Sequence, residues 1–152
     1  MHKFTPLILA SVALFFASCA KDREHKMLVS VAEQKMLVLE RGVPIARYDV
    51  STSKFGLGDV PGSSRTPLGR MEVTEKIGKG APLGMKFKDR RPTGEVVPVD
   101  APGRDPIVTR ILRLRGLERQ NGNAFRRTIN VHGTPEERRI GTPASYGCIR
   151  MR

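Results

Sequence analysis

Three short apolar segments lie close together in the first third of the chain, and they indicate a fold built mainly from β-strands. They cover residues 27–32, 36–40 and 45–50. Glu33-Gln34-Lys35 and Arg41-Gly42 separate them, at intervals typical of β-hairpins. The sequence therefore predicts that this part of the chain runs back and forth as paired strands.

The pattern of short strands and loops continues beyond this region. Residues 51–65 are rich in Gly and Ser and are expected to form a long loop. In Thr66-Pro67-Leu68-Gly69 the proline fixes φ and the glycine frees it, so this segment is predicted to be a turn. Apolar residues at Met71, Val73 and Ile77 then predict a strand.

The second half of the chain begins with a segment rich in Gly and Pro. Residues 79–105 are expected to be an irregular insertion over the sheet, and such loops commonly carry substrate contacts. Residues 107–115 fit either a helix or an alternating strand. Turn signals at Gly116 and Asn121-Gly122-Asn123 follow so soon that we predict a strand.

The strongly basic composition constrains the partners of the protein. A formal net charge of +12, from 27 Lys and Arg against 15 Asp and Glu, indicates an anionic partner or work at an anionic surface. Aromatic residues make up only 5% of the chain, tryptophan is absent and the basic residues are scattered, so we expect no nucleic-acid partner. A wall polymer bearing carboxylates and anionic lipid suit the charge equally well. The length of 152 residues leaves room for a short targeting segment and one domain.

The N-terminus has the pattern of an export signal. Met1-His2-Lys3 is basic, and residues 4–17 are largely apolar and shorter than the ~20 residues of a membrane-spanning helix. Phe16-Ala17-Ser18-Cys19 resembles a bacterial lipobox, so we expect a lipoprotein-type signal peptide at 1–18 and lipidation of Cys19. An ordinary signal peptide cut near the same small residues is the alternative. Residues 19–26 would be a tether, and the product an exported protein of the periplasm or cell envelope, anchored to its membrane through Cys19.

His132 and Cys148, near the C-terminus, are candidates for nucleophilic catalysis. Alternation places Ile129 and Val131 on one face of a predicted strand at 127–132, and His132 at its end on the polar face. A thiol with an ordinary pKa of about 8.5 is mostly protonated at neutral pH, and a neighbouring histidine can supply the thiolate that attacks a carbonyl carbon. Cys148 would be the nucleophile and His132 its base. Taken singly, each residue is more often structural, so that reading stays open.

The segment between these two residues has the signals of a short helix and a tight loop. Thr134 is expected to be the N-cap, Pro135 the first helical residue and Glu137 the end of a capping box, with Gly141 ending the helix. In Ser145-Tyr146-Gly147, small residues would let backbone amides point at a substrate oxygen, as an oxyanion hole requires.

Two motifs together resemble a known family. His132-Gly133-Thr134, followed by Ser145-Tyr146-Gly147-Cys148-Ile149-Arg150-Met151, is similar to the signature of the L,D-transpeptidase (YkuD-type) catalytic domain. The resemblance implies a mainly β, sandwich-like domain with short helices over residues 27–152. It also implies that the Gly133 carbonyl orients the His132 imidazole, and that Arg150 shapes the loop or holds a substrate carboxylate. Ser145, Tyr146 and Gly147 would contact the substrate, with Tyr146 standing where the family most often has a second histidine.

The resemblance also implies an activity. Family enzymes attack the bond between the third residue of a peptidoglycan peptide stem and its terminal D-alanine, form a thioester and pass the acyl group to an amine on a second stem. Neither a cofactor nor a metal is implied, and His2, His25 and His132 are too dispersed to form a zinc site with the cysteines. The alternative from another class is a non-catalytic envelope lipoprotein that binds anionic wall polymer through its basic surface.

The C-terminal end differs from the family pattern. The family continues beyond the Cys-Ile-Arg-Met motif through a helix and a last strand, whereas this chain stops at Arg152. We therefore expect a C-terminally truncated domain that lacks these elements. A helix beginning near Cys148 would lower the pKa of its thiol through the positive end of the helix dipole, and the chain lacks the residues to build one.

Overall fold

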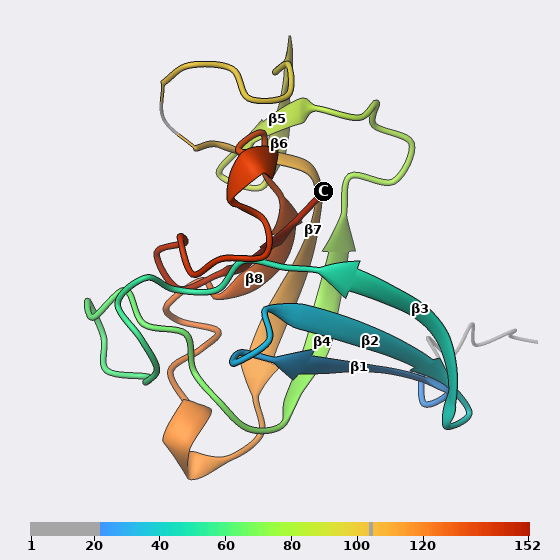
Figure 1. Ribbon diagram of the computed structural model, residues 1–152, viewed down its shortest axis with the longest axis vertical. Helices are drawn as coiled ribbons and strands as arrows, with labels where there is room; N and C mark the ends of the chain where they lie inside the picture. Colours follow the sequence, from blue (N-terminus) through green and yellow to red (C-terminus); the bar gives the residue numbers. More distant parts are fainter. Residues whose placement is uncertain (1–21, 104) are drawn as a thin grey trace, which may run out of the picture.

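A computed structural model describes residues 22–103 and 105–152, so the expected signal peptide at 1–18 and the lipidation of Cys19 lie outside the described residues. The prediction of a mainly β fold is confirmed, because the described residues form two sheets and two single turns of 3-10 helix (Figure 1). This described part of the chain holds no helix that is long and apolar enough to span a membrane. Nor does it bring together three or more His, Cys, Asp or Glu side chains that could hold a metal ion.

The first sheet is an antiparallel meander of three strands. It contains β1 (His25–Ser30), β2 (Lys35–Glu40) and β3 (Val43–Asp49). Arg41 and Gly42 connect β2 to β3 with φ angles of 50° and 87°, as a two-residue hairpin turn with positive φ at both positions requires. The three predicted strands are confirmed, although β1 begins at His25 rather than at residue 27.

The second sheet is built around one long strand. Its members are β4 (Met71–Ile77), β5 (Met85–Lys88), β6 (Arg91–Val96), β7 (Ile107–Gly116), β8 (Asn130–Gly133) and β9 (Ile149–Met151). β4 and β5 pair with successive parts of β7, β8 pairs with residues 108–113 of β7, which overlap both parts, and β9 then pairs with β8. The strands predicted from Met71 to Ile77 and at 107–115 are confirmed as β4 and β7. The pairing of β8 with β9 is parallel, and it brings the C-terminal motif into the centre of the fold.

The expectation of an irregular insertion at residues 79–105 is wrong in part, because this region contains the β5–β6 hairpin. Asp89 and Arg90 make its two-residue turn with φ angles of 50° and 67°. Such turns usually carry Asn-Gly or Asp-Gly, so Asp-Arg gives a weak sequence signal. Pro92 and Gly94 lie inside β6 and are unfavourable in strands, which obscured it further.

The helix expected from Thr134 is reduced to one turn of 3-10 helix, η2 (Glu137–Arg139). Oγ1 of Thr134 accepts the N–H of Glu136, two residues on, at 3.0 Å, as an N-cap side chain can, but the turn begins only at Glu137 and its N-cap residue is Glu136. Glu136 has a ψ of 59°, outside the helical range, while its side chain pairs with the buried Arg150. A tertiary contact therefore overrides the local preference for helix. The other 3-10 turn, η1 (Arg119–Asn121), lies between β7 and β8.

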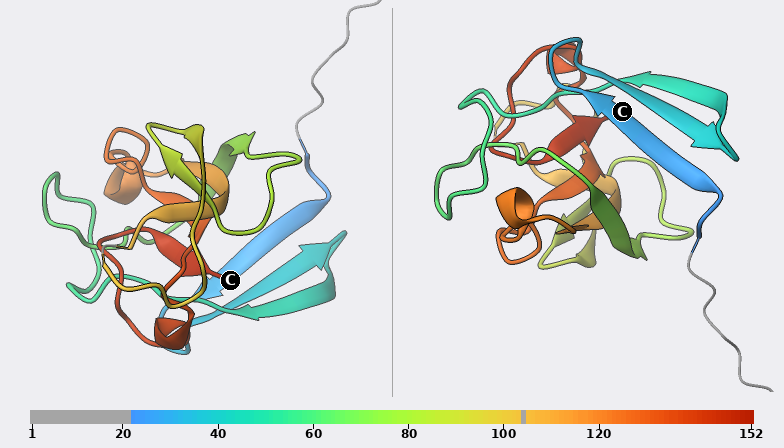
Figure 2. Two further views of the ribbon diagram at one scale, coloured as in Figure 1. Left: turned by 90° about the horizontal axis from the view of Figure 1, so that it is seen from above. Right: turned by 90° about the horizontal axis from the view of Figure 1, so that it is seen from below.

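The hydrophobic core lies between the two sheets, which Figure 2 shows from two further directions. It includes Met36 from β2, Val131 from β8 and Ile149 from β9. Because side chains alternate along a strand, Asn130 and His132, on either side of Val131, project from the opposite face of the sheet. The candidate site is built on that opposite face.

We expect substitutions in the three-stranded sheet to report this packing. Met36 is 1% exposed, so Met36→Ala should lower the free energy of unfolding by about 2–5 kcal/mol through lost burial and a new cavity. Leu28 in the same sheet is 53% exposed, so Leu28→Ala should change the free energy of unfolding by less than about 0.5 kcal/mol. Urea denaturation of both variants checks this, and equal losses would contradict the assignment of the faces.

Candidate active site

The parallel pairing of β8 with β9 sets the positions of the candidate residues. Val131 is opposite Ile149, and His132 is opposite Arg150. Cys148 immediately precedes β9, so the chain runs from the thiol directly into a strand. As expected from the sequence, no helix of the described residues begins at Cys148, so none of them places a helix dipole at this thiol.

The ring of His132 is buried and oriented by a neighbouring carbonyl. Its Nδ1 lies 2.8 Å from the carbonyl oxygen of Gly133, and the residue is 6% exposed. A carbonyl oxygen only accepts hydrogen bonds, so Nδ1 carries the proton and Nε2 of the neutral ring keeps its lone pair. Gly133 must be small, because a Cβ there would lie 2.6 Å from the carbonyl oxygen of Val108. The contact expected between Gly133 and the imidazole is thus present.

Cys148 is half-buried, and its thiol hydrogen-bonds to the backbone rather than to the imidazole. Its Sγ donates to the carbonyl oxygen of Thr128 at 3.5 Å, and no hydrogen bond joins Cys148 to His132 within the described residues. Burial raises the pKa of Cys148 above its ordinary value, although the backbone N–H of Asn130 opposes this shift. Burial also lowers the pKa of His132 below 6.5, against the Gly133 hydrogen bond and the Asp105 charge. At neutral pH the two groups therefore rest as a thiol and a neutral imidazole.

Asn130 is a site residue to which the sequence assigned no role. It is 5% exposed, and its side-chain Oδ1 has no hydrogen-bond partner in the described part of the chain. It precedes His132 by two positions on β8 and therefore shares a face with it. A buried acceptor without a partner is unfavourable by about 1–3 kcal/mol, and a substrate N–H would satisfy it.

The loop before Cys148 is held by Ser145. Its Oγ accepts the N–H of Gly147 at 3.1 Å and donates to the carbonyl of Cys148 at 2.6 Å. The amide of Gly147 is therefore already used, which contradicts its expected part in an oxyanion hole. No hydrogen bond of the described residues uses the N–H of Tyr146 or that of Cys148. These two amides are the available donors of the loop.

Thr66 supports the same loop from another part of the chain. It is 2% exposed, and its Oγ1 donates to the carbonyl of Gly147 at 3.0 Å while accepting the N–H of Ser53 at 3.0 Å. Gly147 has a φ of +119°, a conformation that favours glycine. The sequence marked Thr66 only as part of a turn, whereas the structure places it directly under the Cys148 loop.

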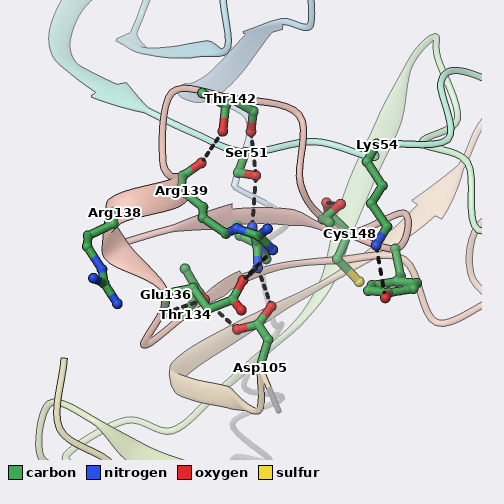
Figure 3. Close-up of polar contacts among 12 residues, drawn as sticks. Ser51, Lys54, Asp105, Thr134, Glu136, Arg138, Arg139, Thr142 and Cys148 are labelled. Atoms are coloured by element: carbon green, nitrogen blue, oxygen red, sulfur yellow. Dashed lines mark hydrogen bonds and ion pairs between the residues drawn. The ribbon is translucent and has the colours of Figure 1, made fainter. Parts of the chain in front are cut away.

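Arg150 is fully buried and bound by three side chains, as Figure 3 shows for its labelled partners. It is 2% exposed and donates to Asp105, to Glu136 at 2.8 Å and to Ser51 at 3.1 Å. A guanidinium in this environment is not accessible to a substrate. The expected role in holding a substrate carboxylate is therefore not supported, and the alternative, that Arg150 shapes the loop, fits these contacts.

We expect removal of this buried cation to be costly. Arg150→Met removes the buried cation that pairs with both Asp105 and Glu136, so it should lower the free energy of unfolding by about 3–5 kcal/mol. Arg115 is the control, because it is 59% exposed where it pairs with Glu72. Arg115→Met should lower the free energy of unfolding by less than about 1 kcal/mol. Denaturation of both variants measures the difference, and a mild effect of Arg150→Met would show that the buried pairs matter little.

The neutral resting state of Cys148 and His132 has a testable pH dependence. A raised thiol pKa means that the thiolate fraction is small at pH 7 and grows only as pH rises past 9.0, so labelling of Cys148 by iodoacetamide should follow that course. His132→Ala should change the rate at pH 7 by less than about threefold, because the resting imidazole carries no charge. Fast labelling at pH 6 that depends on His132 would instead indicate a preformed thiolate and imidazolium pair.

Comparison with known proteins agrees with this architecture. The family model of the L,D-transpeptidase catalytic domain (YkuD) matches residues 24–152. No curated protein sequence matches the chain.

Two solved structures have a similar fold. An L,D-transpeptidase from Mycobacterium smegmatis has a TM-score of 0.53 and 17% identity, over 84% of this chain and 49% of that one. L,D-transpeptidase 3 from Mycobacterium tuberculosis, solved with a faropenem-derived adduct, has a TM-score of 0.50 and 17% identity, over 84% of this chain and 51% of that one. The chain thus spans about half the length of these two proteins. At 17% identity, the similarity shows a shared fold and nothing more. Because the family model covers nearly all of the described residues, the chain belongs to the YkuD family of L,D-transpeptidase catalytic domains.

Proposed function

We propose that this protein is a peptidoglycan L,D-transpeptidase in which Cys148 is acylated by a peptide stem and then deacylated by an amine. The observation that carries the proposal is the orientation of His132. Its Nδ1–H is held by the Gly133 carbonyl, which leaves the basic Nε2 free to accept a proton, and the thiol of Cys148 is partly exposed. Membership of the YkuD family supports the same chemistry.

In the first half-reaction, Nε2 of His132 takes the proton of the Cys148 thiol as Sγ attacks the carbonyl carbon of the third stem residue. The tetrahedral intermediate then collapses, and the bond to the nitrogen of the terminal D-alanine breaks. The imidazolium returns its proton to that nitrogen, so D-alanine leaves as a neutral amine and Cys148 holds the acyl group as a thioester.

In the second half-reaction, an amine of another stem attacks the thioester. His132 accepts a proton from this amine, the bond between carbon and Sγ breaks, and the proton returns to the sulfur. The N–H groups of Tyr146 and Cys148 are the proposed donors to the oxyanion in both halves, because the described residues make no other use of them.

The basic surface and the N-terminal sequence are consistent with an enzyme of the cell envelope. A net charge of +12 favours approach to a wall polymer that carries carboxylates. We propose that the chain is exported and anchored to the membrane through a lipid on Cys19. Peptidoglycan stems are then the partners, in cross-linking or remodelling of the wall.

A second candidate function is a non-catalytic lipoprotein that binds anionic wall polymer. The lack of a hydrogen bond between Cys148 and His132 favours it. This second function would be supported if the protein binds purified sacculi without muropeptide turnover. The binding should weaken with added salt and should be unchanged in Cys148→Ala.

Acylation by a carbapenem tests the enzymatic proposal. Intact-mass measurement should show one covalent adduct on the folded protein and none on Cys148→Ala. His132→Ala should slow adduct formation by about 10²–10⁴-fold, since a positioned base contributes that much. Serine at position 148 keeps the size of the side chain, so Cys148→Ser serves as the folded control. An adduct that persists in both Cys148 variants would falsify the proposal.

A further inference from the structure

The side chains of an exposed cluster at the Cys148 loop take no part in the reaction described above. It consists of Lys54, Phe55 and Tyr146, named here the Lys54 cluster. Tyr146 is 66% exposed and Phe55 is 46% exposed. Large aromatic side chains at this exposure, next to a candidate nucleophile, offer an apolar surface to a ligand.

Backbone pairing fixes the position of the cluster. Ser53 and Ser145 form a parallel bridge, and the N–H of Lys54 donates to the carbonyl of Ser145 at 3.1 Å. Phe55 is held in turn, because its N–H donates to the Oγ of Ser53 at 2.9 Å. Lys54 and Tyr146 therefore occupy neighbouring positions in two paired segments, and the second segment leads to the thiol two residues later.

The side chains of the cluster contact one another. Nζ of Lys54 donates to the Tyr146 hydroxyl at 3.0 Å and lies 4.3 Å from the centre of its ring. The rings of Phe55 and Tyr146 are 5.5 Å apart with an angle of 54° between their planes. Figure 3 shows the side chain of Lys54 with this hydrogen bond, together with the side chain of Cys148. The cation is thus held against the side chain of Tyr146, two residues before Cys148.

The charge of Lys54 is not neutralised within the described residues. No carboxylate of these residues forms an ion pair with it, and the Tyr146 hydroxyl uses one of its three N–H donors. Its charge is felt locally, since the hydrogen bond from Lys54 is the main cause that lowers the pKa of Tyr146. Arg150 differs in each respect, because it is buried and its charge is balanced by two carboxylates.

We propose that the Lys54 cluster is the binding subsite for the free α-carboxylate at the end of the donor peptide, with the ammonium of Lys54 contacting the carboxylate and the aromatic rings contacting the adjacent apolar side chain. This inference rests on the proposed function. The leaving residue is a single amino acid, so its carboxylate lies only three bonds from the carbonyl carbon that Cys148 attacks. A cation at the loop that carries the thiol has the reach to meet it.

Binding of two matched peptides tests the subsite without any chemistry. The full chain with Cys148→Ala is titrated with an acetylated tetrapeptide stem ending in D-alanine, and with the same peptide ending in a carboxamide. The free carboxylate should bind about tenfold more tightly, as a charge-assisted hydrogen bond provides, and the preference should shrink as salt is added. Lys54→Met should bring the ratio of affinities close to one, and Lys54→Arg should retain most of it.

The controls separate this inference from the proposed function. Lys26→Met removes an exposed lysine of β1 and should leave the ratio unchanged. The subsite is overturned if the ratio of affinities is near one in the parent chain, or if Lys54→Met has the same ratio as the parent chain. Release of amine from the peptides by the chain with Cys148 intact is measured in parallel. A preference for the free carboxylate that depends on Lys54, without release of amine, supports the subsite and counts against the enzyme. Equal release of amine from both peptides supports the enzyme and counts against the subsite.

Discussion

The buried ion pairs of Arg150 are the interaction on which the candidate site depends. Its guanidinium joins β9 to Ser51, to Asp105 and to Glu136, three segments that are distant in the sequence. Removing such a charge from water costs several kcal/mol, which only close partners offset. Arg150 is also opposite His132 in the strand pairing, so the network that fixes β9 fixes the surroundings of the imidazole.

This network explains why burial controls the protonation of the site. Asp105 raises and Arg150 lowers the pKa of His132, so the two charges oppose each other there. They oppose each other at Cys148 as well, where Asp105 raises and Arg150 lowers the pKa. Desolvation is then the largest influence on both groups, and it favours their neutral forms. The ion pair thus supplies rigidity without forcing a charge onto the reacting groups.

The sequence predicted the strands that have a clear apolar pattern and a conventional turn. β1 to β4 and β7 were found in this way, and the strand predicted at 127–132 corresponds to the shorter β8, which runs from Asn130 to Gly133. The β5–β6 hairpin was missed because its turn, Asp89-Arg90, lacks glycine and because β6 contains Pro92. The helix at Thr134 was predicted from capping residues, but the pairing of Glu136 with Arg150 limits it to one turn.

The site itself was only partly accessible to sequence reasoning, for a physical reason. His132, Gly133 and Cys148 lie in one short stretch, where spacing and alternation carry information about geometry. Asp105 is 45 residues away in sequence from its partner Arg150. Lys54 is 92 residues away in sequence from its partner Tyr146. Contacts over such separations are set by the order of strands in the sheets, and no local pattern encodes that order.

The arrangement of charges suits the approach of an anionic peptide in the proposed reaction. A resting thiolate roughly 6 Å from an incoming carboxylate would repel it by about 3 kcal/mol at an effective dielectric constant near 20. A neutral thiol avoids this repulsion, and the exposed ammonium of Lys54 attracts the carboxylate instead. Proton transfer to His132 then occurs with attack on the carbonyl, so negative charge on sulfur develops only when it is moving onto the substrate. The structural cation is buried at Arg150, and the cation open to a ligand lies at Lys54. This separation lets the site bind an anion without disturbing the ion pairs that hold it together.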